Sequence, residues 1–155
     1  AGAPHPSHQW SIADYSEPID RALDLGIGRT VHAGEGGRPP AEIRQAIELL
    51  HAQRIGHGTS LLEDLSVVEL VINENVVVEA CPTSNMQTGI ISSVNSHPLP
   101  QWLELGVQAC VNCENWLLSD INPVEEHRRA LGIPGMPETL LAQCVETGRN
   151  AAFSS

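Results

Sequence analysis

Apolar side chains recur at helical spacing in several separate stretches of the chain. After Ser16, which can cap a helix with Pro18 in its first turn, an apolar stripe runs to Gly26. A second stripe follows the two prolines at 39–40. Positions three and four residues apart share one face of a helix. The pattern predicts helices near residues 16–26, 39–50, 65–72, 99–105, 124–131 and 137–147.

Four short apolar runs between these stripes predict β-strands. They are IGRTVHAGE at 27–35, RIGHG at 54–58, VVVEA at 76–80 and VQACVNC at 107–113. Strand and helix alternate four times, at a spacing that fits βαβ units and a parallel sheet. The predicted fold class is therefore α/β, with residues 1–15 as an N-terminal loop and residues 16–155 as the folded unit.

The number of strands leaves two architectures open. Four βα units are half of an eight-stranded barrel, which typically needs about 250 residues, whereas the chain has 155. The chain is either a complete small α/β sheet or half of a TIM-type (β/α)8 barrel, completed by another chain or a second copy. Because an open half-barrel exposes two strand edges and part of its core, it is expected to have a covering partner.

The charge balance excludes some partners. All 8 basic residues are arginine, against 19 acidic residues, and the formal net charge is −11. Because phosphates would repel such a surface, neither nucleic acid nor an anionic membrane is an expected partner. No apolar run approaches the ~20 residues of a membrane span, and no signal-peptide pattern is visible. The four cysteines lie in apolar contexts, which favours reduced thiols in a cytoplasmic protein.

Polar groups stand at the carboxyl ends of the predicted strands, where function gathers in parallel α/β folds. They are HAGE at 32–35, His57, CPTSN at 81–85 and NCEN at 112–115. A single histidine at a strand end is more often a structural residue. Imidazole and carboxylate groups at four strand ends can instead converge above the sheet, a set that suits a divalent metal, a water molecule and an acid–base partner.

The pair Cys110 and Cys113 could suggest a redox centre or a zinc chelate. Residues three apart on an extended strand point to opposite faces, however, so core cysteines are the favoured interpretation. Zinc deaminases that act on cytidine use H-x-E followed by P-C-x-x-C. This chain has H-x-x-E, and Ala109 precedes the cysteine pair, which argues against that class.

The motifs at the strand ends resemble those of the adenosine deaminase family. TVHAGE at 30–35, RIGHG at 54–58 and EACPTSNMQTG at 79–89 occur in the family's order, and the opening Ala1-Gly2 and closing NAAFSS extend the match. The resemblance covers nearly the whole chain, but only strands five to eight of the family's barrel. It implies that the chain is the C-terminal half-barrel of a metal-dependent hydrolase.

The resemblance also implies a reaction, the zinc-dependent hydrolytic deamination of adenosine or a related aminopurine nucleoside. His32 matches the zinc ligand of the fifth strand. Glu35 matches the acid that protonates the purine ring, and His57 the histidine that orients and deprotonates the attacking water. The chemistry agrees, because a metal lowers the pKa of water toward about 7 and a neutral carboxyl can donate to the ring.

Three further residues carry the resemblance. Gly2 matches a backbone contact to the purine. Glu114 and Asn115 stand where the family has two consecutive aspartates, the first a metal ligand and the second a substrate contact. Glutamate is also a hard oxygen ligand but is one methylene longer, so it displaces the metal unless the backbone retreats. Asparagine keeps one acceptor and two donors for a purine ring nitrogen but loses the charge.

The family's other two zinc histidines belong to the first strand of its barrel, which this sequence lacks. His5 and His8 are the N-terminal histidines here, and nothing in the sequence shows that they substitute. The resemblance therefore implies a complementary N-terminal half-barrel chain, or a homodimer, as the partner. A catalytically degenerate module that acts through binding or oligomerisation is the alternative, as is a related reaction on adenine or a modified purine.

Overall fold

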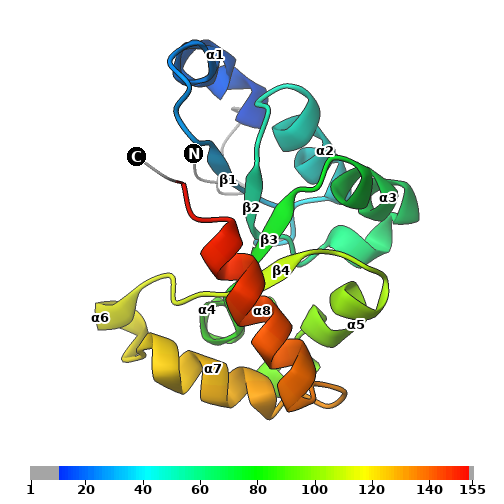
Figure 1. The fold of residues 1–155 in the computed structure, drawn as a ribbon, viewed down its shortest axis with the longest axis vertical. Helices are drawn as coiled ribbons and strands as arrows, with labels where there is room; N and C mark the ends of the chain where they lie inside the picture. The colour runs from blue at the N-terminus through cyan, green and yellow to red at the C-terminus, as the bar shows by residue number, and fades with distance from the viewer. Residues whose placement is uncertain (1–10, 154–155) are drawn as a thin grey trace.

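The computed structural model describes residues 11–153 and arranges four strands in one parallel sheet, in the order β1-β2-β3-β4 (Figure 1). Within the sheet, Ile55 lies opposite Val31 and Val78, and Val78 also lies opposite Ala109. Helices connect the successive strands, so the predicted α/β fold is confirmed. The strands are β1 (Thr30–Ala33), β2 (Arg54–His57), β3 (Val77–Ala80) and β4 (Ala109–Val111).

Six helices coincide with the predicted apolar stripes. They are α1 (Ser16–Asp24), α2 (Pro40–Glu48), α3 (Leu65–Asn73), α5 (Leu99–Glu104), α7 (Pro123–Leu131) and α8 (Glu138–Asn150). Two more, α4 (Pro82–Gln87) and α6 (Trp116–Ser119), were not predicted. Helix α6 has 4 residues, and the 6 residues of α4, PTSNMQ, are mostly polar, so neither segment shows an apolar period.

The beginning of α1 differs from the prediction. Tyr15 occupies the N-cap position and Ser16 is the first helical residue. The cap lies earlier because Ser11 and Asp14 form a capping box on a 3-10 turn, Ile12–Tyr15, in which the Ser11 N–H donates to Asp14 Oδ2 at 2.9 Å. Ile12 is buried in the core, so the described end of the predicted 1–15 loop packs against the rest of the fold.

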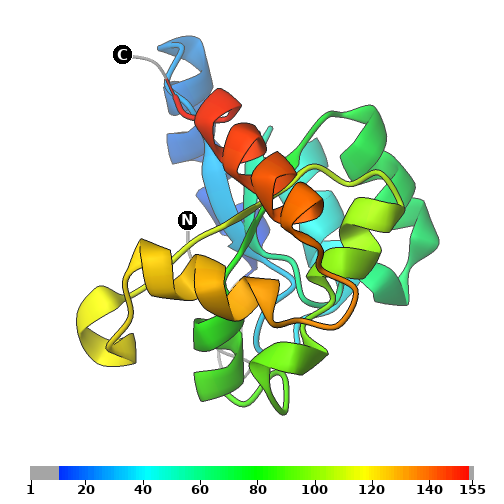
Figure 2. The ribbon, with the colours of Figure 1, turned by 60° about the horizontal axis from the view of Figure 1, so that its bottom comes forward.

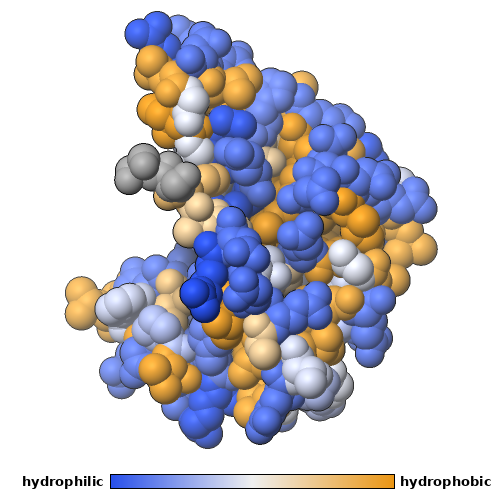
Figure 3. Space-filling model, viewed as in Figure 1, coloured by the Kyte–Doolittle hydropathy of each residue, from blue (hydrophilic) through white to orange (hydrophobic). Residues whose placement is uncertain are grey.

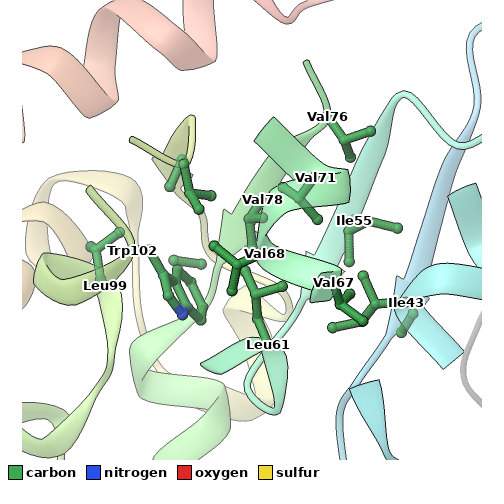
Figure 4. Packing of buried hydrophobic residues seen from close by; sticks show 14 of the residues in the cluster. Ile43, Ile55, Leu61, Val67, Val68, Val71, Val76, Val78, Leu99 and Trp102 are labelled. Atoms are coloured by element: carbon green, nitrogen blue, oxygen red, sulfur yellow. The ribbon is translucent and has the colours of Figure 1, made fainter. Parts of the chain in front are cut away.

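The main core lies between one face of the sheet and helices α2, α3 and α5. Alternate strand residues point to this face, and Figure 4 shows Ile55 and Val78 facing Val67 and Val71 of α3. Trp102 of α5 is fully buried in the same cluster. Burying such side chains removes apolar surface from water, which stabilises the fold by roughly 25 cal/mol per Å² of buried apolar surface.

The other face of the sheet carries polar side chains on β1, β2 and β3. Thr30 Oγ1 donates to Glu79 Oε2 at 2.8 Å, and Arg54 Nε is 3.3 Å from Glu79 Oε1. Among residues 11–153 no strand pairs with the outer edge of β1 or of β4. The sheet is therefore open at both sides in the described part of the chain. No helix within that part is both long enough and apolar enough to span a bilayer.

The helices that follow the carboxyl ends of β3 and β4 gather at one end of the molecule. Helix α4 contacts both α6 and α7 there, and the three helices come forward in Figure 2. Exposed apolar side chains lie on α6 at this end (Figure 3): Trp116 is 62% exposed, Leu117 94% and Leu118 84%. The candidate site lies at the same end of the sheet.

Candidate metal centre and active site

Four of the candidate residues converge at the carboxyl end of the sheet. His32 lies in β1, Glu35 in the following turn, His57 at the end of β2 and Glu114 after β4. His57 Nε2 is 3.3 Å from Glu35 Oε2 and 3.5 Å from Glu114 Oε1. His32 Nδ1 is 4.0 Å from Glu114 Oε1, and the two imidazole rings meet edge to face with centroids 4.8 Å apart. All four side chains are within reach of one ion or small molecule.

The glycines of the RIGHG motif create space for this convergence. Gly56 lies opposite His32 in the sheet, and a Cβ on residue 56 would be 2.4 Å from His32 Cδ2. Any side chain there would push the imidazole away. Gly58 has φ +61°, and a Cβ there would be 2.9 Å from Val78 Cγ1. Both positions therefore require glycine for steric reasons.

The turn that presents Glu35 is held from two sides. Gly34 has φ +67°, and its N–H donates to Glu42 Oε2 at 3.2 Å. Glu42 belongs to α2, is 3% exposed and also accepts from Arg38 Nε at 2.8 Å. Thr59 Oγ1 donates to the Gly34 carbonyl at 2.7 Å. These bonds fix the backbone of Gly34, from which the Glu35 side chain is presented.

His57 is buried and conformationally strained. Its φ is 68°, a region that non-glycine residues rarely adopt, and its side chain is 0% exposed. Nδ1 lies 3.1 Å from Asn85 Nδ2. Nε2 faces the two carboxylates but makes no hydrogen bond with the described residues. A buried polar atom without a partner is costly, so Nε2 is ready for a ligand.

A second buried histidine lies behind Asn85. His97 Nε2 is 3.3 Å from Asn85 Oδ1, and the Leu99 N–H donates to His97 Nδ1 at 3.1 Å. The His97 ring packs edge to face against Trp102, with centroids 5.2 Å apart. Asn85 begins this connection from α4, directly after the strand-end CP pair. Hydrogen bonds therefore link His57 to the beginning of α5.

Burial changes the acid–base properties of the site. It raises the pKa of Glu35 to about 7, and the neighbouring Glu114 carboxylate contributes in the same direction. Burial lowers the pKa of His57 to about 4, although Glu114 opposes this shift. A neutral carboxyl group beside a neutral imidazole is thus favoured around neutral pH. Such perturbed groups at a strand end are typical of functional sites.

Glu114, the candidate metal ligand, and Asn115, the candidate substrate contact, both follow β4 and make further contacts. The Ser84 hydroxyl donates to Glu114 Oε2, which fixes one oxygen of that carboxylate. Asn115 is the N-cap of α6, and its Oδ1 accepts from the Leu118 N–H at 3.0 Å. This leaves the Asn115 amide protons as donors. Gly2, together with His5 and His8, lies outside the described residues.

The donor set fits a zinc ion in part. The candidate ligand atoms of His32, Glu35 and His57 all lie within 4.8 Å of one another, and Glu114 Oε1 lies 4.0 Å or less from both imidazoles. Imidazole nitrogen and carboxylate oxygen are ligands that zinc accepts, normally four in total. His57 Nε2, which lacks a hydrogen-bond partner among the described residues, faces this set and would contact a water molecule held there.

All four cysteines are free thiols. Cys110 is buried and its Sγ accepts from Asn112 Nδ2 at 3.1 Å, whereas Cys113 is only partly buried. Cys110 therefore behaves as the core residue that strand geometry favoured. Sequence reasoning missed other residues, Ser84, Asn85 and His97. The CPTSN motif contained a signal for the first two, but the lone His97 before Pro98 gave none.

A parallel sheet with histidines and carboxylates at its carboxyl end is typical of enzymes built on a TIM-type barrel. Within that class, the sequence profile described as adenosine deaminase matches residues 1–155. The chain therefore belongs to the adenosine deaminase family, as the strand-end motifs predicted.

Individual relatives agree with this assignment. An adenosine deaminase of Yersinia enterocolitica is 38% identical over 137 residues, which are 88% of this chain and 41% of that protein. The crystal structure of an adenine deaminase from Arthrobacter aurescens superposes with a TM-score of 0.89 at 27% identity, covering 99% of this chain and 47% of that one. The chain thus spans less than half the length of these relatives, and the expected half-barrel is confirmed.

A third comparison shows the fold alone. An amidohydrolase from Burkholderia ambifaria, solved with bound zinc, superposes with a TM-score of 0.87 at 22% identity. It covers 99% of this chain and 43% of that protein. The described part of the chain, including the helices around the candidate site, is therefore arranged as in that protein.

Proposed function

We propose that this chain supplies one half of the active site of an enzyme that hydrolytically deaminates adenosine or a related aminopurine nucleoside. The observation that carries the proposal is the convergence of Glu35 and Glu114 on His57 Nε2, at 3.3 and 3.5 Å. Membership of the adenosine deaminase family supports the reaction class, and the names of the Yersinia and Arthrobacter proteins support an aminopurine substrate.

His32 and Glu114 would hold a zinc ion in this proposal. Zinc lowers the pKa of a water molecule toward about 7 and so supplies a nucleophile at neutral pH. Ser84 supports this role of Glu114, because its hydroxyl group binds the second carboxylate oxygen and orients the first. The remaining ligands would come from strands that complete the barrel.

Glu35 acts as the acid. Its pKa is raised to about 7. At neutral pH the Glu35 side chain is therefore protonated in a large fraction of the molecules and can donate its proton to a ring nitrogen of the purine. The water oxygen forms a bond to carbon 6, the carbon–nitrogen bond breaks, and the amino group leaves as ammonia. His57 contacts the attacking water. One hydrogen of that water ends on the ammonia, and the other replaces the proton that Glu35 gave to the ring nitrogen.

Asn115 and Gly2 would contact the substrate. The Asn115 Oδ1 is engaged as the cap of α6, so its amide group can offer only donors to an acceptor nitrogen of the purine. Gly2 would contribute a backbone contact, as in the family motif that Ala1-Gly2 resembles.

The open edges of β1 and β4 support a second half that completes the barrel. A native mass spectrum of the purified protein shows which chain supplies this second half. A mass of this chain plus a different chain and zinc supports a complementary half-barrel, and twice this mass supports a homodimer. The four free thiols favour a reducing, cytoplasmic environment for the assembly.

The substitution Glu35→Gln tests the reaction. In the assembled protein it should lower the rate of conversion of adenosine to inosine at least about 100-fold, because a general acid contributes about 10²–10⁴-fold. Glu63→Gln changes an exposed acid on the same chain and serves as the matched control. Full activity of Glu35→Gln would refute the assigned role.

A non-catalytic binding module is the second candidate. Glu114 and Asn115 favour it, because they replace the pair of aspartates that the family motif implies. Wild-type assembly that holds no zinc and leaves adenosine unchanged would support this candidate over the enzyme.

A further inference from the structure

The hydrogen bonds behind His57 have a single consistent direction. A backbone N–H can only donate, so the Leu99 N–H makes His97 Nδ1 an acceptor at 3.1 Å. A neutral imidazole carries one proton, which must then be on His97 Nε2. His97 is neutral, because it is 3% exposed and its burial lowers the pKa to about 3. Trp102 packs against the ring and holds it in this orientation.

The direction is transmitted through Asn85. His97 Nε2–H donates to Asn85 Oδ1 at 3.3 Å, which places the amide NH2 group on the opposite side, facing His57. The NH2 group is a donor only, and it lies 3.1 Å from His57 Nδ1. Asn85 is 0% exposed, and its backbone N–H donates to the Cys81 carbonyl at 2.9 Å. The amide group thus has no water available to reverse it.

We propose that His97 and Asn85 are positioning residues that hold His57 as the Nε2–H tautomer, so that His57 donates a hydrogen bond into the site. The Nδ1 lone pair is occupied by Asn85, and the remaining proton points toward Glu35 and Glu114. His57 can therefore orient a nucleophile by donating to its oxygen. It does not accept a proton there, in contrast to the deprotonating role that the resemblance implies for this histidine.

A consequence for catalysis rests on the proposed function. If His57 donates, a carboxylate must accept the proton that the attacking water loses. Glu35 becomes a carboxylate once its proton has passed to the ring nitrogen, and its Oε2 lies 3.3 Å from His57 Nε2. The water oxygen then bonds to carbon 6, one proton of the water bonds to Glu35, and Glu35 later passes it to the departing amine. When the carbon–nitrogen bond breaks and the carbonyl group forms, the second proton of the former water passes from its oxygen to Glu35. Glu35 ends the cycle protonated, as it began.

Nitrogen NMR of the imidazole rings in the purified full chain tests the tautomer without metal or substrate. We expect the proton of His57 on Nε2 and an acceptor-type signal from Nδ1. A proton on Nδ1 in the wild-type protein would overturn the proposal. Because this measurement is independent of turnover, its failure is distinguishable from a failure of the deamination assay.

Variants test the two positioning residues separately. His97→Gln retains a donor toward Asn85 and should keep the single His57 tautomer, whereas His97→Leu should give a mixture of both tautomers. Asn85→Leu can neither donate nor accept and should also give the mixture. Asn73→Leu, an exposed amide in α3, is the matched control and should leave the His57 signal unchanged.

The outcomes are decisive in both directions. A single Nε2–H tautomer that persists in Asn85→Leu and His97→Leu would mean that neither residue sets it, and the proposal fails. A merely structural role would lower stability without moving the proton between the ring nitrogens. Dispersed amide spectra of each variant confirm that the fold is retained during the comparison.

Discussion

The Glu35 carboxyl group lies 3.3 Å from His57 Nε2, and the fold shifts the pKa of each group in the direction that favours its neutral form. Burial is the larger cause for each residue, and it acts in opposite directions on the pKa of an acid and of a base. The Glu114 carboxylate raises the pKa of Glu35 further by repulsion. One short turn and one strand end thus bring together an acid whose protonated form is favoured and an imidazole whose uncharged form is favoured.

Removing the charge of Glu114 should lower the pKa of Glu35. In Glu114→Gln the repulsion is absent, so the midpoint should move from about 7 toward the ordinary value of 4.5. Carbon NMR titration of the Glu35 carboxyl group in metal-free protein measures this directly. Glu69→Gln, an exposed acid in α3, should leave the midpoint unchanged. An unchanged midpoint in Glu114→Gln would show that burial alone sets it.

The raised pKa of Glu35 should also make stability depend on pH. Between pH 4.5 and about 7 the folded protein holds a proton that the unfolded chain has released, so the free energy of unfolding falls as pH rises through this window. His57 acts oppositely between about 4 and 6.5, because its pKa is lowered. Urea unfolding of wild type and Glu35→Gln separates the two: the variant should gain stability relative to wild type progressively from pH 4.5 to 7. A constant difference contradicts the prediction.

Zinc binding should depend on the histidine in β1. His32→Asn and Glu114→Gln should each lower zinc affinity at least about ten-fold, since even indirect supporting contacts of metal ligands contribute about 10–100-fold. Equilibrium dialysis of the assembled protein, with metal quantification, measures the loss. His51→Asn is the matched control, because His51 lines the pocket around Arg54 and Gln53 at the amino end of β2. Equal loss in all three variants would indicate non-specific binding.

The glycine opposite His32 provides a steric test of the same site. In Gly56→Ala the added methyl group would lie 2.4 Å from His32 Cδ2, so the ring must rotate or move. Zinc affinity should fall about as far as in His32→Asn while the amide NMR spectrum keeps its dispersion. Gly106→Ala has open space around its Cβ and a φ of +92°, so it carries backbone strain but no contact with the site. Its zinc affinity should equal that of wild type.

The strand-end motifs were sufficient to predict which side chains meet. His32, His57 and Glu114 each follow an apolar run that ends in a glycine or polar turn, and parallel strands bring those ends to one edge. The short helices α4 and α6 were not predictable in the same way. Their caps, Cys81 and Asn115, begin segments whose residues show no apolar period.

The hydrogen bonds that link His57 through Asn85 to His97 could not be predicted from the sequence either. Asn85 lies in α4 and His97 directly follows the 3-10 helix Val94–Ser96, and only tertiary packing brings their side chains to 3.3 Å. A lone histidine before a proline is equally typical of an exposed loop, so nothing in the local pattern distinguishes the two environments. The correct strand ends therefore located the site, whereas the buried polar groups that orient it required the packed structure.

The buried carboxylate of Glu42 should contribute more to the free energy of unfolding than an ordinary surface carboxylate on a helix. It accepts from the buried Gly34 N–H at 3.2 Å and from Arg38 Nε at 2.8 Å. Glu42→Ala leaves that N–H without an acceptor and should lower the free energy of unfolding by about 2 kcal/mol, the usual loss for a charged hydrogen bond. Urea unfolding at constant pH measures the change.

Glu48 provides the matched control on the same helix. It pairs with Arg44 at 3.1 Å with the same spacing, but its side chain is 49% exposed. Glu48→Ala should therefore change the free energy of unfolding by less than about 1 kcal/mol. Since Gly34 directs the turn that presents Glu35, Glu42→Ala should also lower the pKa of Glu35 from about 7 as water enters, and Glu48→Ala should not. Equal effects of the two variants would show that the buried N–H bond contributes nothing beyond a surface pair.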